Sequence, residues 1–237
     1  MATPNPRTCA TVPERAIVHS AVVRVTHWLV AISFFSLVIS GIAILIIHPR
    51  LYWGETGTWD MPSLIDLPLT YTRGHSGWGR SLHFLAAWVC VLSGLIYIVT
   101  GLINDHFRAD LIPSKAELNW RSMVGVIRHH LRRRRPADED SWRYNVVQRL
   151  TYLVVAFVLF PAMIWTGLAM SPSITSQYPF MVTMLGGHQS ARTLHFIVAN
   201  ILVGFLIVHL AMLFLVGFRV RVVAMITGYG PNRSADA

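Results

Sequence analysis

Four apolar stretches constrain the fold of this chain more than any other feature. About 20 helical residues cross the roughly 30 Å of hydrocarbon in a bilayer, and each stretch is long enough. None of them has an Asp, Glu, Lys or Arg in its middle, and they run over about residues 26–47, 82–103, 150–170 and 193–218. Backbone groups in lipid must be satisfied within the span, which favours helices. The sequence therefore predicts an all-α membrane protein, a four-helix transmembrane bundle that forms a single domain over residues 1–237.

The distribution of basic residues predicts the orientation of the bundle. Residues 1–25, 104–149 and 219–237 share one side of a four-span protein and hold 16 of the 20 basic residues. The segments on the other side, 48–81 and 171–192, hold the remaining four. Because basic loops stay in the cytoplasm, both termini are expected there, in a bacterial inner membrane.

The net charge of +9 is then mostly a topology signal rather than a sign of nucleic-acid binding. Within the cytoplasmic loop 104–149, Ser114 and Glu117 form a capping-box pattern. Apolar residues follow among cationic ones, which predicts an interfacial helix over 114–131. The arginine run 132–135 fits contact with anionic membrane lipid, and no nucleic-acid partner is expected.

Histidines stand near the ends of three spans, each three residues after an arginine. A histidine in hydrocarbon is costly and usually marks function. A fourth lies deeper in the last span, and the set is Arg24 with His27, Arg80 with His83, Arg192 with His195, and finally His209. A single such histidine can instead be a core hydrogen bonder, and an interfacial arginine can simply extend to the headgroups. Four histidines with three matched arginines favour the functional interpretation.

Topology predicts how the four histidines pair. The chain enters the first span from the cytoplasm, so His27 lies near the inner face, whereas His83 and His195 open spans entered from outside. His209 is 14 residues beyond His195, about 21 Å deeper and nearly four helical turns on. We therefore expect His83 to pair with His195 in the outer half of the bilayer, and His27 to pair with His209 in the inner half.

Two imidazoles at one depth suit the two axial positions of a haem iron. A bis-histidine site is closed to oxygen and serves electron transfer. Cys9 and Cys90 form no Cys-x-x-Cys-His motif and no cluster, so covalent haem, iron–sulfur and zinc sites are excluded. The expectation is two noncovalent b haems with irons about 20 Å apart. The guanidinium groups of Arg24, Arg80 and Arg192 are expected to bind haem propionates.

The other seven histidines carry weaker signals. His48 and His106 lie at span ends and are expected to be interfacial, while the cytoplasmic segments hold His19, His129 and His130. His75 and His188 fall in the outer loops, where a structural role is favoured and partner contact or proton relay stays open.

With these residues in place, the chain resembles the dihaem cytochrome b subunits of formate dehydrogenases, nickel–iron hydrogenases and thiosulfate reductases, which are bacterial cytochrome b561-like proteins. The resemblance covers residues 17–225. It implies an electron-transfer subunit with a periplasmic molybdenum, iron–sulfur or hydrogenase-type partner that carries the substrate chemistry. Residues 144–149, Tyr-Asn-Val-Val-Gln-Arg, are similar to a formate dehydrogenase motif that borders a quinone pocket. The resemblance thus implies that Asn145 and Gln148 bind menaquinone or ubiquinone, although both can also cap a helix.

Two alternatives are also compatible with the sequence. The chain could be a stand-alone cytochrome b561 quinone oxidoreductase with a small diffusible donor, or a non-redox membrane anchor. The length of the loop 48–81 and its tryptophans, Trp53, Trp59 and Trp78, favour a protein partner.

Overall fold

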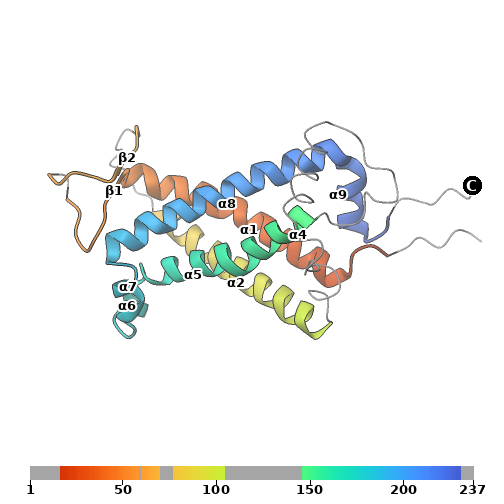
Figure 1. Cartoon of the computed structure of the whole chain (residues 1–237), viewed down its shortest axis with the longest axis horizontal. Helices are drawn as coiled ribbons and strands as arrows, with labels where there is room; N and C mark the ends of the chain where they lie inside the picture. The colour runs from red at the N-terminus through yellow and green to blue at the C-terminus, as the bar shows by residue number, and fades with distance from the viewer. Residues whose placement is uncertain (1–16, 59, 70–76, 105–145, 231–237) are drawn as a thin grey trace, which may run out of the picture.

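Four long apolar helices run the length of the molecule in the computed structural model, which describes residues 17–58, 60–69, 77–104 and 146–230 (Figure 1). Each is long and apolar enough to cross a membrane. Three are continuous: α1 (Ala21–Ile47), α2 (Gly77–Ile103) and α8 (His188–Val216). The other is built from α4 (Val146–Val154), the π-helical segment η3 (Val155–Leu159) and α5 (Phe160–Leu168). The predicted all-α transmembrane bundle is confirmed.

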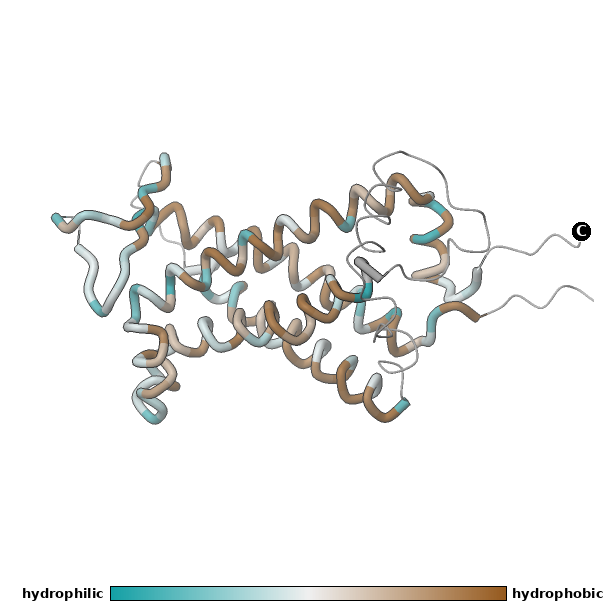
Figure 2. Tube along the Cα trace, in the orientation of Figure 1, coloured by the Kyte–Doolittle hydropathy of each residue, from teal (hydrophilic) through white to brown (hydrophobic). Residues whose placement is uncertain are grey.

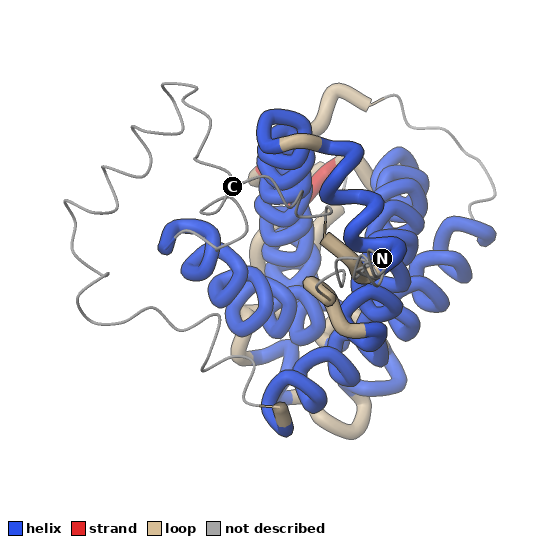
Figure 3. Tube along the Cα trace, turned by 90° about the vertical axis from the view of Figure 1, so that its right-hand side faces the viewer, coloured by secondary structure: helices blue, strands red, loops and turns tan. Residues whose placement is uncertain are grey.

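Apolar residues occur all around these helices rather than on one stripe (Figure 2), which is the pattern of helices surrounded by lipid. Viewed from one end, helices make up most of the described chain (Figure 3). All four spans begin earlier than predicted, at residues 21, 77, 146 and 188 instead of 26, 82, 150 and 193. The polar first turns of these helices extend beyond the apolar stretch, and hydropathy does not detect them. The three arginines named above therefore lie inside helices.

Helices α1 and α2 pack together through small residues. On α1 the buried positions recur every seven residues, at Thr26, Ser33 and Ser40. A Cβ atom on Gly79 of α2 would lie 3.1 Å from the Cβ of Ala43. Small side chains let the two backbones approach closely in a membrane, and the Ser and Thr hydroxyls donate to carbonyls of their own helix.

The third span changes its helical form one turn before Pro161. The N–H of Phe160 donates to the carbonyl of Val155, as in a π-helix. Proline has no N–H and clashes with the preceding turn of an α-helix, and a π-bulge is one way in which a helix accommodates such a residue. Pro161 therefore accounts for the π-helical segment η3.

The loops at one end of the bundle are folded and attached to α8, and we call this the loop end. Strands β1 (Arg50–Leu51) and β2 (Ile65–Asp66) form a small antiparallel sheet that the sequence did not predict. An ion pair joins Arg50 to Asp66 at 3.1 Å. The second loop contains the short helices α6 (Pro172–Thr175) and α7 (Phe180–Thr183).

Backbone and hydroxyl hydrogen bonds hold the first loop against the start of α8. Gly54 donates from its N–H to Ser190 Oγ at 2.8 Å and accepts from the N–H of Gln189 at 2.9 Å. The hydroxyl of Thr193 donates to the carbonyl of Tyr52 at 2.6 Å. Glu55 accepts from the N–H of His188 at 3.3 Å. His188 was expected in a loop, but it is the first residue of α8.

The opposite end of the bundle, the α9 end, contains a helix that the sequence did not predict. The fourth span was expected to reach residue 218, but α8 ends at Val216 and Gly217 takes a φ of 119°. After this turn α9 (Phe218–Thr227) leaves the direction of α8 (Figure 1). Near its end the N–H of Val18 donates to the carbonyl of Gly228 at 2.8 Å. Both ends of the described chain therefore lie on the same side of the bundle.

Candidate functional site

Two histidines from different helices face each other near the loop end. His83 lies in the second turn of α2 and His195 in the second turn of α8. Their ring centroids are 6.2 Å apart and their planes are inclined by 60°. Both helices start at the loop end, so the two histidines lie at the same depth, as the order of the spans predicts. We call these two residues the loop-end pair.

A second pair of histidines lies toward the α9 end. His27 of α1 and His209 of α8 have ring centroids 6.5 Å apart, with planes inclined by 55°. The ring of Phe205, one turn earlier on α8, stacks on His209 at 5.9 Å. We call His27 and His209 the α9-end pair. Helix α8 contributes one histidine to each pair, about 21 Å apart along its axis at 1.5 Å per residue.

The separation within each pair matches that of two imidazoles on one metal. A histidine nitrogen binds a metal at about 2.0–2.1 Å, and the ring centroid lies about 1.1 Å farther, so opposed ligands have centroids about 6.3 Å apart. Over the described residues, no group of three or more His, Cys, Asp or Glu side chains converges on a metal position. A pair of neutral nitrogens is a poor site for a bare ion, but it fits haem iron, to which the porphyrin supplies the other ligands.

Buried hydroxyls contact both rings of the loop-end pair, and sequence reasoning missed them. Ser40 Oγ on α1 lies 2.9 Å from Nδ1 of His83. Thr166 Oγ1 on α5 lies 2.9 Å from Nδ1 of His195. Each of these spans contains more than one Ser or Thr, so the sequence did not single out Ser40 or Thr166.

The three arginines that were expected to act alike have different surroundings. Arg24 donates to the carbonyl of Ile226 at 2.6 Å, and its buried Nε has no hydrogen-bond partner among the described residues. Arg192 is partly buried and donates to the carbonyl of His48 and to Gln189 Oε1. Arg80 is exposed. An unpartnered, buried guanidinium nitrogen is chemically suited to a carboxylate, so Arg24 fits a propionate best.

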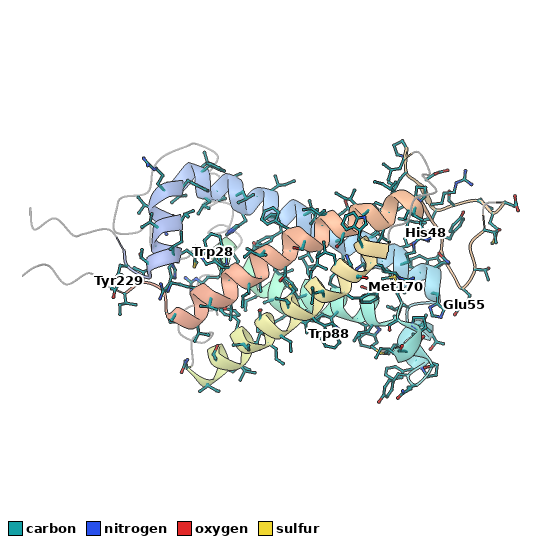
Figure 4. All side chains as sticks on the ribbon, turned by 180° about the vertical axis from the view of Figure 1, so that it is seen from behind. Trp28, His48, Glu55, Trp88, Met170 and Tyr229 are labelled. Carbon is teal, nitrogen blue, oxygen red and sulfur yellow. The ribbon has the colours of Figure 1, made fainter. Side chains whose placement is uncertain are left out.

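Two of the described histidines outside the spans, His48 and His19, have a lowered pKa. Partial burial of the ring, then the charges of Arg192 and Arg80, lower the pKa of His48. At the other end, burial and the charges of Arg221 and Arg24 lower the pKa of His19. Figure 4 shows His48 at the loop end and Trp28 and Tyr229 at the α9 end. Both bundle ends therefore carry concentrated positive charge.

Several predicted features lie outside the described residues. Asn145 is one of them, and Gln148 is described only as a backbone position in α4. The loop 104–149 is described only at its ends, so its interfacial helix at 114–131 also lies outside. The same holds for His75, His106, His129 and His130.

The arrangement defines a four-helix membrane protein with two layers of paired histidines. The chain belongs to the prokaryotic cytochrome b561 family, whose family model matches residues 18–228. It is 30% identical over 213 residues to the "putative protein-methionine-sulfoxide reductase subunit YedZ1" of Azospira oryzae, an alignment that covers 90% of this chain and 96% of that protein. No solved structure matches the chain. The resemblance stated from the sequence is confirmed, and the family is one of multi-pass bacterial membrane proteins that bind b haem and transfer electrons.

Proposed function

We propose that the chain binds two b haems, one through His83 and His195 and the other through His27 and His209, and carries electrons across the membrane between them. A haem with two histidine ligands exchanges single electrons without opening a coordination position. The observation that carries the proposal is the pair of ring separations, 6.2 and 6.5 Å, at two depths of one bundle. A haem layer in each half of the bilayer is the arrangement that transmembrane electron transfer requires.

The proposed roles of the arginines follow from their surroundings. Arg24 is proposed to hold a propionate beside the α9-end pair, and the support is its buried Nε, which has no hydrogen-bond partner among the described residues. Arg192 and Arg80 are proposed to act at the loop-end pair. Both are close enough to His48 to lower the pKa of its ring, so the two positive charges lie near each other. Two guanidinium groups in this position favour the paired carboxylates of one porphyrin.

We propose that the α9 end faces the cytoplasm and the loop end faces the periplasm of a bacterial inner membrane. The excess of basic residues in 1–25, 104–149 and 219–237 supports this orientation. The meeting of Val18 with Gly228 supports a common side for both termini. The loop-end pair is then the outer layer, and the α9-end pair the inner layer.

The outer layer is proposed to exchange electrons with a soluble oxidoreductase subunit. The attached loop, residues 48–69, makes a folded surface beside the loop-end pair, and Trp53 and Trp78 are exposed there. The relative from Azospira oryzae is named as a subunit of a reductase, which supports a multi-subunit assembly in which the substrate chemistry is on another chain. The proposed partner is a molybdenum, iron–sulfur or hydrogenase-type subunit. If no partner subunit is found, the alternative is a stand-alone cytochrome b561 that takes electrons from a small diffusible donor.

The inner layer is proposed to exchange electrons with menaquinone or ubiquinone. The support is the sequence pattern Tyr144-Asn145-Val146-Val147-Gln148-Arg149, whose Asn and Gln side chains can donate to a quinone carbonyl. This segment leads into α4, and Tyr152 farther along the same helix packs its ring on Phe205 at 6.4 Å, beside His209. Helix α4 therefore approaches the inner layer.

The experiment is spectroscopy and haem analysis of the purified protein. We expect two b haems per chain and a reduced spectrum with the sharp alpha band of low-spin b haem. Added quinol should reduce both haems, whereas Asn145→Ala with Gln148→Ala should slow that step and leave the spectrum unchanged. A protein with far fewer than two haems per chain contradicts the two-layer proposal, and a protein without haem leaves only the membrane-anchor alternative. Copurification of a redox subunit decides between the partner and the diffusible donor.

A further inference from the structure

The hydroxyls of Ser40 and Thr166 contact the two histidines of the loop-end pair from neighbouring helices. Ser40 is fully buried and Thr166 is 3% exposed, so water does not compete for these contacts. Ser40 comes from α1 and Thr166 from α5, whereas the histidines belong to α2 and α8. Two separate helix pairs have thus placed the same chemical group at the same atom of each ring.

The partners of each hydroxyl determine which nitrogen of each imidazole carries the proton. Ser40 Oγ lies 2.7 Å from the carbonyl of Ser36, and Thr166 Oγ1 lies 2.8 Å from the carbonyl of Ala162. A hydroxyl has one hydrogen and a carbonyl can only accept, so each hydroxyl donates to its own helix. Toward the histidine it can only accept. Nδ1 of both rings therefore carries the hydrogen, and Nε2 keeps its lone pair.

This arrangement has a consequence for any metal bound between the rings, if the proposed function holds. A ligating histidine whose other N–H is accepted by a neighbour is held in one tautomer and one orientation and becomes a more basic ligand. The accepting hydroxyl is itself polarised by its bond to a carbonyl, which strengthens its hold on the N–H. More basic ligands favour the ferric over the ferrous state, since the ferric ion has the higher charge.

We propose that Ser40 and Thr166 are positioning residues that fix the Nδ1–H tautomer of His83 and His195 and lower the reduction potential of the haem held by that pair. The effect is specific to one layer. Within the described part of the chain, no side-chain hydroxyl hydrogen-bonds to the ring of His27 or His209. Those rings contact aromatic rings, Trp28 at 5.6 Å and Phe205 at 5.9 Å.

The test is a redox titration of the haem-loaded protein with Ser40→Ala, Thr166→Ala and the double variant. The chain supplies a matched control, because Ser33 is also a buried α1 serine and its hydroxyl donates to the carbonyl of Leu29 at 2.7 Å without touching a histidine. A His209→Met background identifies the signals of the loop-end haem. The readouts are the two midpoint potentials, the electron paramagnetic resonance g values of the ferric haems and the haem content.

We expect Ser40→Ala and Thr166→Ala each to raise the potential of the loop-end haem, by up to about tenfold in its reduction constant, which is about 59 mV for one electron. The double variant should also lose loop-end haem by about tenfold in affinity. Ser40→Thr and Thr166→Ser should restore the wild-type values because they keep the hydroxyl, and Ser33→Ala should change nothing.

Unchanged potentials and g values in the double variant, with haem content as in Ser33→Ala, would overturn the inference and leave the proposed function intact. The inference is also wrong if the midpoint potential of the α9-end haem changes as much as that of the loop-end haem. If Ser40→Ala does not fold, Thr166→Ala compared with Thr166→Ser still decides, because Thr166 contacts His195, the other histidine of the same pair. Wild-type protein without haem would instead contradict the proposed function.

Discussion

Arg24 donates a hydrogen bond to the backbone carbonyl of Ile226, 202 residues later in the chain. The contact places a positive charge at the carboxyl end of α9, where unpaired carbonyls carry partial negative charge. Trp28 Nε1 donates to the neighbouring carbonyl of Met225 at 3.3 Å. Two side chains of α1 therefore hold the end of α9 against the start of the first span.

Replacing Arg24 with Ala should detach α9. A hydrogen bond from a charged donor contributes about 1.5–3 kcal/mol, and this loss should lower the melting temperature and speed tryptic cleavage after Arg219 and Arg221. Arg24→Lys should retain part of the stability, and Arg80→Ala, at an exposed position, should have no such effect. Cleavage at the wild-type rate would show that the bond does not hold α9. A change in midpoint potential that is confined to the α9-end haem would separately support the binding of a propionate by Arg24.

Replacing His209 with Met should affect only the α9-end layer. His83 and His195 are held by Ser40 and Thr166 on other helices, and none of these contacts includes His209. We expect the loop-end haem to keep its potential and g values, whereas the second haem is lost or changes its spectrum. Haem quantification and low-temperature spectra measure both. His48→Ala, outside the two pairs, is the control, and loss of both haems in His209→Met would argue against independent sites.

Gly187 should tolerate no side chain. Its φ is 118°, and an added Cβ would lie 2.5 Å from the carbonyl carbon and oxygen of Gly54. A left-handed conformation and an overlap with backbone together cost about 2–4 kcal/mol. Gly187→Ala should therefore separate the loop 48–69 from α8, seen as faster amide exchange at Gly54 and Gln189. Gly77→Ala, where an added Cβ meets nothing within 4 Å, is the matched control. Equal exchange rates in the two variants would contradict the expectation.

The pKa of His48 predicts how pH affects stability. Partial burial and the charges of Arg192 and Arg80 hold its folded-state pKa below the ordinary value. The folded state therefore prefers the neutral ring, and this contribution is present above about pH 6.5 and is lost as the pH falls below it. His48→Gln should reduce the loss of melting temperature between about pH 7 and about pH 5. Arg80→Ala should reduce it by a smaller amount, because it raises the pKa of His48. His19, at the α9 end, also has a lowered pKa. His19→Gln should therefore also reduce the loss of melting temperature at low pH.

The sequence was sufficient for the spans and for the meeting of the histidines. Depth in a membrane follows from the order of the spans, and the helical rise converts 14 residues into about 21 Å. This is why His27 could be matched with His209, and His83 with His195, before any coordinates. Such a prediction is rarely possible for a soluble protein, because no membrane assigns a depth to its residues.

The contacts of the paired histidines could not be predicted in the same way. Ser40 and Thr166 are ordinary residues in their spans, and only the rotation of α1 and α5 shows that they face a ring. The turn at Gly217 was missed for a similar reason, since the apolar sequence continues into Phe218 and only a left-handed φ ends α8. The attachment of residues 48–69 to α8 depends mainly on backbone groups, Gly54 and Tyr52, whose partners carry no sequence signature.

Helix α8 carries one histidine of each layer. His195 and His209 belong to the same continuous helix, whereas their partners, His83 and His27, belong to two different helices. Twisting or sliding α8 displaces both rings together. A movement of α2 displaces only His83, whereas α1 carries His27 and also Ser40, which contacts His83. Residues 52–55 hydrogen-bond to the first turns of α8. A displacement of that loop therefore moves α8, and with it the histidines of both layers.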